Sequence, residues 1–411
     1  MRRVLMIAYH FPPLTGSSGI QRTLRFVQHL PALGWEPLVL TADPRAYERT
    51  SPDLLADVPT STIVRRAFAL DTARHLQLRG RYIGAMARPD RWISWRWDGV
   101  RQGLRMIRQF KPELIWSTYP IATAHLIGKA LHLKTGLPWI ADFRDPMAQE
   151  GYPADTRTWE SYRSIEADAA RLASYCVFTS PGAAAEYRQR YPDAAPRMVV
   201  VENGYDEESF AGVALSVGAP IRDRAVTLLH SGIVYPSERD PSHLFDALAG
   251  LQQSGRLTPA DLRIRFRASA HDDLLRSSAA ERGVLDFVEL APAIPYRQAL
   301  AEMLEVDGLL VLQASNCNAQ IPAKIYEYLR AGRPILGLTD PIGDTAGVLR
   351  HAGIETQAPL DAPQAIADSL VDFVQRLRSG RLNLPRTEAV TQASRRGRTQ
   401  QLIPLLDSAV R

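Results

Sequence analysis

The chain has only two cysteines among its 411 residues, Cys176 and Cys317, and they lie in opposite halves. A disulfide framework uses several cysteines in a short chain, so this pair favours a protein of the reducing cytosol. Long apolar runs are also missing, and the first run, Val4–Tyr9, soon meets Pro12 and Pro13. Runs of this length fit buried strands and are too short for an export signal or a membrane span. We therefore expect a cytoplasmic protein that, where a membrane is involved, lies on its surface.

The sequence also lacks an obvious metal site, because no Asp-x-Asp triplet occurs and the nine histidines are scattered. No short repeat or low-complexity tract is present. The net charge of +5 and the isoelectric point of about 9.2 are compatible with nucleic acid, anionic lipid or phosphorylated ligands. The arginines do not gather around a recognised nucleic-acid-binding module, so we expect no nucleic-acid partner. We expect no metal, because no such site is visible, and no cofactor, because the dinucleotide fingerprint Gly-x-Gly-x-x-Gly is not met.

Short apolar runs alternate with amphipathic stretches along the whole chain, which predicts α/β units with parallel sheets covered on both faces. In the first half the expected strands are Val4–Tyr9, Leu38–Thr41, Ile63–Ala67, Leu114–Thr118, Trp139–Phe143, Cys176–Thr179 and Val199–Val201. In the second half they are Val226–His230, Leu262–Phe266, Phe287–Leu290, Gly308–Leu312 and Pro334–Leu338.

The alternation lapses between Asn203 and Arg224, which predicts a linker between two doubly wound, Rossmann-like domains. We expect an N-terminal domain of residues 1–203 and a C-terminal domain of residues 204–387. A last helix, residues 388–411, is expected to pack back on the first domain.

One segment, Ala69–Asp98, breaks this rhythm because it combines six arginines with Trp92, Trp95 and Trp97. Aromatic side chains interleaved with arginines suit a membrane interface or stacking on a ligand. Alternatively, the segment is an insertion whose tryptophans pack on the first domain while its arginines face water.

Two stretches of the first half carry candidate site residues. Gly16 and Gly19 follow the first strand where a helix begins, and glycines there allow a ligand to approach the backbone and the helix N-terminus. Asp142, Arg144 and Asp145 end a central strand, where open parallel sheets bind ligands. A local Arg–Asp pair that pins the loop is the alternative for these three charges.

The second half repeats the pattern after the strand that ends at His230. Ser231 and Gly232 come next, and Arg239 follows in a loop, where it either points toward a ligand or pairs with Glu238. Later, "GDTAGVL" predicts a helix start that offers Thr345 to a phosphate.

The stretch "QIPAKIYEYLRAGRPILGL" places Lys324 and Glu327 on one face at the start of a helix. A lysine is unfavourable at a helix N-terminus, because both are positive, and a bound phosphate would relieve the conflict. Glu327 could then accept hydrogen bonds from a ribose. The alternative is that Lys324 and Glu327 only pair with each other.

Three motifs, in order, resemble the retaining glycosyltransferases of family 4, which have two Rossmann-like domains facing across a cleft (GT-B). They are the opening "HFPPLTGSSGIQRTLRF", the hinge "VENGYDEESF" and the helix "PAKIYEYLRAGRPIL". The resemblance spans nearly the whole chain. It implies transfer of a sugar from a nucleotide-sugar donor, with retention and without metal, to a glycan or lipid-linked acceptor in surface polysaccharide synthesis. It also implies a peripheral position on the inner face of the plasma membrane.

The resemblance also implies roles for the candidate residues. The donor binds mainly to the second domain and the acceptor to the first. Gly16 and Gly19 would lie beside the donor's phosphate and sugar. Arg239 and Lys324 would bind the diphosphate, and Glu327 the ribose. Arg144, with Asp142 and Asp145 beside it, would lie at the reacting sugar, where many relatives have a histidine. The catalytic candidates are thus Arg144, Asp142, Asp145 and Arg239.

Two positions depart from the family pattern, because Ala319 stands where an acidic residue is expected and Ile233 where an arginine is expected. These departures keep two other hypotheses open. A sugar-nucleotide epimerase of the same architecture would turn over the donor without an acceptor. A non-catalytic relative would bind the nucleotide sugar without transferring it.

Overall fold

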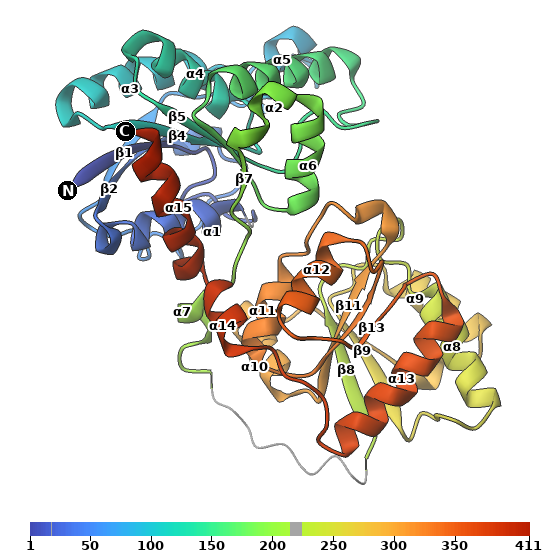
Figure 1. Cartoon of the computed structure of the whole chain (residues 1–411). Coiled ribbons are helices and arrows are strands. Elements are labelled where there is room, and N and C mark those ends of the chain that lie inside the picture. The colour runs from blue at the N-terminus through green and yellow to red at the C-terminus, as the bar shows by residue number, and fades with distance from the viewer. Residues whose placement is uncertain (18, 214–223) are drawn as a thin grey trace. The chain divides into compact units, whose positions relative to one another are not determined.

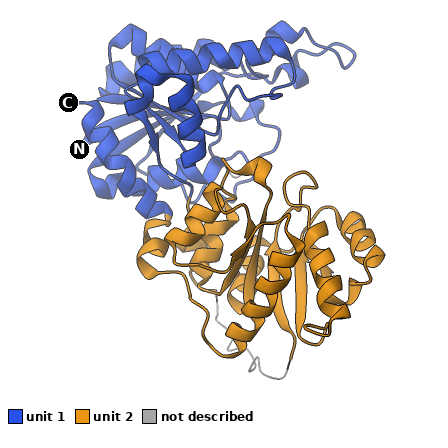
Figure 2. Ribbon diagram, turned by 45° about the vertical axis from the view of Figure 1, so that its right-hand side comes forward, with its two compact units in different colours: residues 1–203, 395–411 blue, residues 204–394 orange. Residues whose placement is uncertain are grey.

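The computed structural model describes residues 1–17, 19–213 and 224–411. They form two compact units (Figure 2): unit 1 comprises Met1–Asn203 and Arg395–Arg411, and unit 2 comprises Gly204–Ser394. The expected linker, residues 203–224, falls partly outside the described residues, since 214–223 are not among them.

Unit 1 contains a seven-stranded parallel sheet with helices on both faces (Figure 1). In sheet order the strands are β3 (Ile63–Ala67), β2 (Trp35–Ala42), β1 (Arg2–Ile7), β4 (Leu114–Thr118), β5 (Trp139–Arg144), β6 (Tyr175–Phe178) and β7 (Met198–Val200). The α-helices are α1 (Gly19–His29), α2 (Thr72–His75), α3 (Trp95–Phe110), α4 (Thr123–Thr135), α5 (Thr156–Leu172), α6 (Pro181–Arg190) and α15 (Arg395–Ala409).

The side chains of β1 show how this sheet is buried on both sides. Leu5 and Ile7 lie in the core under α3, α4, α5 and α6, whereas Val4 and Met6 lie in the core under α1 and α15. Successive strand residues point to opposite faces, so a run without polar residues fits a sheet that is covered twice.

Unit 2 contains a second, six-stranded parallel sheet. In sheet order the strands are β10 (Val288–Ala291), β9 (Leu262–Arg267), β8 (Val226–Ser231), β11 (Gly308–Gln313), β12 (Ile335–Thr339) and β13 (Gln357–Ala358). The α-helices are α7 (Glu207–Phe210), α8 (Ser242–Gln253), α9 (Asp272–Glu281), α10 (Tyr296–Glu305), α11 (Lys324–Ala331), α12 (Asp344–His351), α13 (Pro363–Arg378) and α14 (Thr387–Gln392).

Both sheets are doubly wound, so the predicted fold class is confirmed. In unit 1 the strand order reverses between β1 and β4, and in unit 2 it reverses between β8 and β11. Ligands of such sheets bind outside the carboxyl ends of the strands at this reversal. The loops that follow β1 and β8 are therefore where a site is expected in each unit.

The prediction of a single C-terminal helix over residues 388–411 is wrong. The chain forms two helices there, α14 and α15, with a break at Ala393 and Ser394. The Ala393 carbonyl accepts a hydrogen bond from the Tyr205 amide at 3.1 Å, and Ser394 pairs with Tyr205 in a short bridge. α14 belongs to unit 2. α15 belongs to unit 1, where Leu402 and Leu406 share a core with the residues of α1.

Candidate functional site

In unit 1 the loop after β1 and the start of α1 bring a histidine close to Gly19. The Gly19 amide donates to Ser17 Oγ at 3.2 Å, and Ser17 Oγ lies 3.0 Å from His10 Nδ1. Ser17 Oγ accepts from the amide, so its own proton is available for His10 Nδ1. Burial, followed by the positive charge of Arg144, lowers the pKa of His10 to about 4. His10 is therefore neutral at physiological pH.

Arg144 lies against Gly19 on the other side of the same loop. A Cβ added to Gly19 would lie 2.5 Å from Arg144 Nη1 and 2.5 Å from His10 Nδ1, so any larger residue would displace these two side chains. At Gly16, by contrast, glycine is needed for the backbone angle φ of 82°. The two predicted glycines thus have separate local reasons, a close approach and a turn.

Arg144 has an uncommon backbone that a β-bulge produces. The pairing of β5 with β6 shifts register between Asp142 and Arg144, and φ of Arg144 is 64°. Its carbonyl accepts from the amide and the hydroxyl of Thr179, both at 2.9 Å. Bulges of this kind re-aim a side chain at the end of a strand. Here the bulge directs the Arg144 guanidinium toward Gly19.

The guanidinium of Arg144 is poorly satisfied by the protein. Nη1 donates to the Tyr119 carbonyl over 3.5 Å, and Nε is buried with no hydrogen-bond partner. Among the described residues no carboxylate forms an ion pair with it. Burial lowers the pKa of Arg144, but an arginine stays protonated in proteins. The unit therefore holds a fixed positive charge with hydrogen-bond donors to spare.

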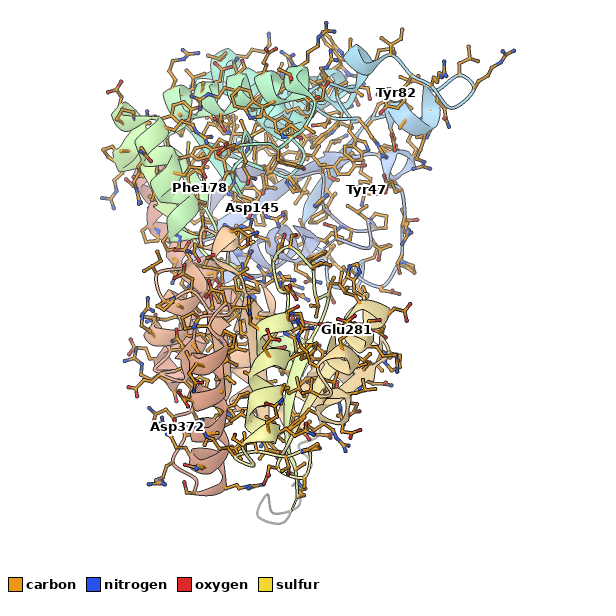
Figure 3. The ribbon with its side chains drawn as sticks, turned by 90° about the vertical axis from the view of Figure 1, so that its right-hand side faces the viewer. Tyr47, Tyr82, Asp145, Phe178, Glu281 and Asp372 are labelled. Carbon is orange, nitrogen blue, oxygen red and sulfur yellow. The ribbon has the colours of Figure 1, made fainter. Side chains whose placement is uncertain are left out.

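The other two charges of this strand end differ from Arg144. Asp142 is fully buried and receives two hydrogen bonds from Arg22, Nε to Oδ2 at 3.0 Å and Nη2 to Oδ1 at 2.8 Å. Thr118 Oγ1 donates to Oδ2 at 2.9 Å. Asp145 is exposed, and Figure 3 shows it near Phe178, the last residue of the neighbouring strand β6. The structure therefore separates the predicted trio: Asp145 is exposed, Arg144 is half-buried, and Asp142 is enclosed.

In unit 2 the predicted residues Lys324 and Gly232 meet at the carboxyl end of β8. Lys324 Nζ lies 3.0 Å from His230 Nε2, and His230 Nδ1 lies 3.1 Å from the Leu310 carbonyl. A carbonyl only accepts, so Nδ1 carries the ring proton and Nε2 accepts from lysine. Gly232 has a φ of 109°, which favours glycine, and a Cβ at this position would crowd Lys324, since it would lie 3.2 Å from Nζ.

Lys324 and Arg239 form a cationic cluster beside Gly232. Burial, together with the charge of Arg239, lowers the pKa of Lys324 to about 7. Arg239 Nη1 donates to the Ile233 carbonyl at 3.0 Å, and its Nε is buried without a partner. Arg239 Nη2 lies 3.8 Å from Glu238 Oε2, which is the pair that the alternative interpretation expected. This pair leaves the buried Nε of Arg239 unsatisfied. An anion between Lys324 and Arg239 would stabilise both charges.

Three further predicted residues, Ser231, Glu327 and Thr345, belong to the same unit. The Ser231 amide donates to the Tyr328 hydroxyl at 2.8 Å, which fixes the start of the loop. Glu327 lies one turn into α11, and its Oε1 accepts from the Tyr296 hydroxyl at 2.7 Å. Thr345 lies at the start of α12 but is buried, and its hydroxyl donates to the Gln320 carbonyl at 3.1 Å. Its side-chain proton is therefore already used inside the protein.

A pocket of about 670 Å³ lies at the carboxyl ends of β9 and β10, beside the loop that carries Gly232. His271, Asp272 and Pro292 are among the residues that line it. The Gly232 amide donates to the Arg267 carbonyl at 2.8 Å, so the loops after β8 and β9 run side by side.

The pocket wall is strained, because two of its residues, Ala268 and Ala270, have φ of 55° and 63°. Left-handed conformations of residues other than glycine gather at binding sites.

The sequence alone did not single out His10, Arg22, His230 or Tyr296. His10 and His230 carry a usable signal, since His10 directly follows the first apolar run of its half and His230 is the last residue of the corresponding run. Arg22 and Tyr296 have no such signal, because their partners, Asp142 and Glu327, are distant in sequence. Among the described residues no group of histidines, cysteines and carboxylates is arranged to hold a metal ion.

The architecture is that of the GT-B glycosyltransferases, as comparison with solved structures shows. A glycosyltransferase from Rickettsia africae superposes with a TM-score of 0.64 at 11% identity, covering 100% of this chain and 99% of that one. The Anabaena protein HepE, solved with UDP and glucose, gives 0.62 at 14% identity, covering 99% and 100%. A Listeria monocytogenes protein described as a UDP-N-acetylglucosamine 2-epimerase gives 0.56 at 10% identity, covering 99% and 96%.

The sequence comparison is more specific for the first half of the chain. Residues 18–204 match the family model of the glycosyl transferase 4-like domain, so unit 1 contains such a domain. No curated protein matches the chain by sequence. In the described part of the chain, every helix is too short or too polar to span a bilayer.

Proposed function

We propose that the protein is a retaining, metal-independent glycosyltransferase that moves a sugar from a nucleotide sugar to an acceptor. The observation that carries this proposal is the Lys324–Arg239 cluster, which lies, like the pocket, at the carboxyl edge of the second sheet. Two positive charges, of which Arg239 has a carboxylate only at 3.8 Å and keeps a buried, unsatisfied Nε, suit a diphosphate. The glycosyl transferase 4-like domain in residues 18–204 supports the choice of reaction.

In this proposal the nucleotide extends from the cationic cluster into the 670 Å³ pocket. Lys324 and Arg239 bind the diphosphate, Gly232 and Ser231 let it approach the loop backbone, and Glu327 accepts hydrogen bonds from the ribose. Ile233 stands where relatives have an arginine, and the Arg239 guanidinium donates to its carbonyl. Positive charges held in place stabilise the nucleoside diphosphate as it departs.

The acceptor is proposed to bind unit 1, near Arg144. Arg144 cannot act as a general base, because a guanidinium does not lose its proton at working pH. It supplies a fixed charge and free hydrogen-bond donors. The departing phosphate itself takes the proton of the acceptor hydroxyl. We propose a glycan or lipid-linked saccharide of surface polysaccharide synthesis as the acceptor, used at the cytoplasmic face of the membrane.

Nucleotide binding should weaken as the pH rises above 7. Lys324, with its pKa of about 7, is half deprotonated at that pH, and an anion favours the charged form. Binding above pH 7 therefore takes up a proton, and the affinity for a nucleoside diphosphate should fall roughly tenfold or more between pH 7.5 and 9. Calorimetry in buffers of different ionisation enthalpy measures both the constant and the proton. Lys324→Met should bind weakly with no such slope, and an unchanged slope in this variant would contradict the role of Lys324.

Glu327→Ala should weaken nucleoside diphosphate binding about 10- to 150-fold, because a ribose hydroxyl loses a charged acceptor worth about 1.5–3 kcal/mol. Tyr296→Phe is the matched control, since it removes the internal donor to Glu327 and keeps the carboxylate. Calorimetry with the ribose nucleotide and its 2′- and 3′-deoxy analogues completes the test. A deoxy penalty that persists in Glu327→Ala would mean that Glu327 does not contact the ribose.

Sugar transfer should survive EDTA at full rate, because Lys324, Arg239 and the backbone amides of unit 2 would stabilise the departing diphosphate. The measurement is the initial rate with and without the chelator. Loss of activity that Mn²⁺ or Mg²⁺ restores would contradict the proposed chemistry.

The epimerase alternative has one observation in its favour, the likeness of the fold to the Listeria monocytogenes protein. The two functions separate by one assay, because an epimerase consumes the sugar nucleotide without an acceptor. A thermal-shift screen of UDP, GDP, ADP and their sugars identifies the donor first. A ligand at a hundredfold its dissociation constant stabilises the protein by about 2.7 kcal/mol. If no nucleotide stabilises the protein, the proposed function is wrong; binding without any turnover would identify a non-catalytic relative.

A further inference from the structure

Residues 74–86 of unit 1 form a run of thirteen consecutive exposed residues, "RHLQLRGRYIGAM". Five of them are large apolar residues, Leu76, Leu78, Tyr82, Ile83 and Met86, with exposures of 39–79%. None of the thirteen is acidic, and three are arginines. Figure 3 shows Tyr82 on this segment, which projects from the body of unit 1. Apolar side chains exposed together with positive charge indicate an interaction surface.

The base of this segment is held firmly. The Thr72 amide donates to the Arg91 carbonyl at 2.8 Å, and Thr72 Oγ1 donates to the Met86 carbonyl at 2.9 Å. Arg91 in turn forms an ion pair with the buried Asp71. These contacts fix both ends, so the exposed residues are presented by a rigid base.

The tip is a tight hairpin that points two arginines away from the protein. Leu78 and Arg81 exchange two backbone hydrogen bonds, of 2.8 and 3.1 Å, and φ is positive at Arg79 and Gly80. This is the geometry of a two-residue hairpin turn. Among the described residues, the guanidinium groups of Arg79 and Arg81 form no ion pair. Leu78 is 79% exposed and Ile83 68% exposed, on either side of these charges.

The tryptophans of Ala69–Asp98 divide between the two expected roles, packing on unit 1 and exposure at an interface. Trp95 is fully buried, and Trp92 packs on Tyr9 with ring centroids 4.8 Å apart, so these two belong to the core. Trp97 is 77% exposed. The acidic residues Asp71 and Asp90 are both buried. The exposed carboxylates Glu48 and Asp155 pair with Arg91 and Arg88 beside the segment, so residues 74–86 themselves carry only positive charge.

We infer that residues 74–86 dock unit 1 onto an anionic lipid bilayer. Leu78, Tyr82 and Ile83 enter the headgroup boundary, and Arg79 and Arg81 contact the lipid phosphates. Charge complementarity selects this occupant, because arginines flanked by aliphatic and aromatic side chains suit a negatively charged interface. The inference does not rest on sugar transfer, because lipid binding requires neither donor nor acceptor.

The test is co-sedimentation of the full-length protein with vesicles of phosphatidylcholine alone and of phosphatidylcholine mixed with phosphatidylglycerol. Binding is expected only to the mixed vesicles and should fall with added salt. Each arginine near an anionic surface contributes about fivefold, so Arg79→Gln/Arg81→Gln should reduce partitioning about 25-fold. Leu78→Asp/Ile83→Asp should reduce it at least as much. Leu133→Asp, at a position 60% exposed on α4 of the same unit, is the control and should bind as wild type.

Three results would overturn the inference. They are absence of binding to the mixed vesicles, wild-type binding by both hairpin variants, and equal loss in the Leu133→Asp control. Size-exclusion chromatography tests a fourth such result. An oligomer that dissociates in Leu78→Asp/Ile83→Asp would show that residues 74–86 bind a second copy of the chain. Nucleotide affinity, measured in parallel, separates this outcome from failure of the proposed function. If nucleotides bind and vesicles do not, only the lipid surface is wrong.

Discussion

Asp142→Ala is expected to lower the free energy of unfolding of unit 1 by about 3–5 kcal/mol, because it leaves the charge of Arg22 buried without a partner. The exposed fraction of the side chain is 2% for Arg22 and 0% for Asp142, and two hydrogen bonds join them. Thr118 loses its acceptor as well. Arg22→Ala should cost a similar amount, since the carboxylate is then the uncompensated charge.

Asp145→Ala is the matched control for this prediction. Asp145 follows the same strand but is exposed, so its loss should change stability by less than about 0.5 kcal/mol. The seven tryptophans of the chain all lie between residues 35 and 159, so their fluorescence during urea unfolding follows unit 1 alone. If Asp142→Ala were as stable as Asp145→Ala yet inactive, Asp142 would act on the substrate and its structural role would be secondary.

Arg144→Ala is expected to lower kcat about a hundredfold or more while the affinity for the nucleotide hardly changes. The loss corresponds to one preorganised donor, about 2.7–4 kcal/mol of transition-state stabilisation. Nucleotide binding is spared because the proposed nucleotide residues belong to unit 2. The measurement is steady-state kinetics with a matched donor and acceptor, together with calorimetry of the nucleoside diphosphate.

Two further variants at this position sharpen the result. Arg144→Lys keeps the charge but loses the planar array of donors, so it should recover only part of the activity. Arg144→His restores the residue of many relatives and should exceed Arg144→Ala. The tryptophan unfolding curve checks that each variant folds. Near wild-type kcat in Arg144→Ala would make Arg144 a structural residue and would contradict the proposed position of the reaction centre.

Lys324 shows how far local sequence reasoning reaches at a site. A lysine in the first turn of a helix is unfavourable, because its charge and the N-terminal end of the helix dipole are both positive. This conflict predicts a bound anion. The structure adds that Lys324 is buried against His230, which lies 94 residues earlier in the chain, and this burial lowers the pKa of Lys324. Desolvation depends on every neighbour in space, so no short window of sequence contains it.

Thr345 and Asp142 mark the limit of the same reasoning. Both residues occupy sequence positions typical of ligand-binding residues: Thr345 lies at a helix start and Asp142 at a strand end. The Gln320 carbonyl and the Arg22 guanidinium nevertheless occupy their polar atoms. Each partner is distant in sequence. A residue of the same type can bind a ligand or stabilise the fold, depending on whether another group of the folded protein already forms a hydrogen bond with it.

The sequence by itself determined the two parallel α/β sheets, since apolar runs of strand length and helical spacing are local properties of the chain. It also determined which loops carry charge at the carboxyl ends of the strands. Only the tertiary structure decided that Asp142 is enclosed, that Arg144 keeps free donors above Gly19, that α14 and α15 are separate, and that residues 74–86 stand exposed. These outcomes follow from burial and charge pairing between residues far apart along the chain, and such contacts exist only once the chain has folded.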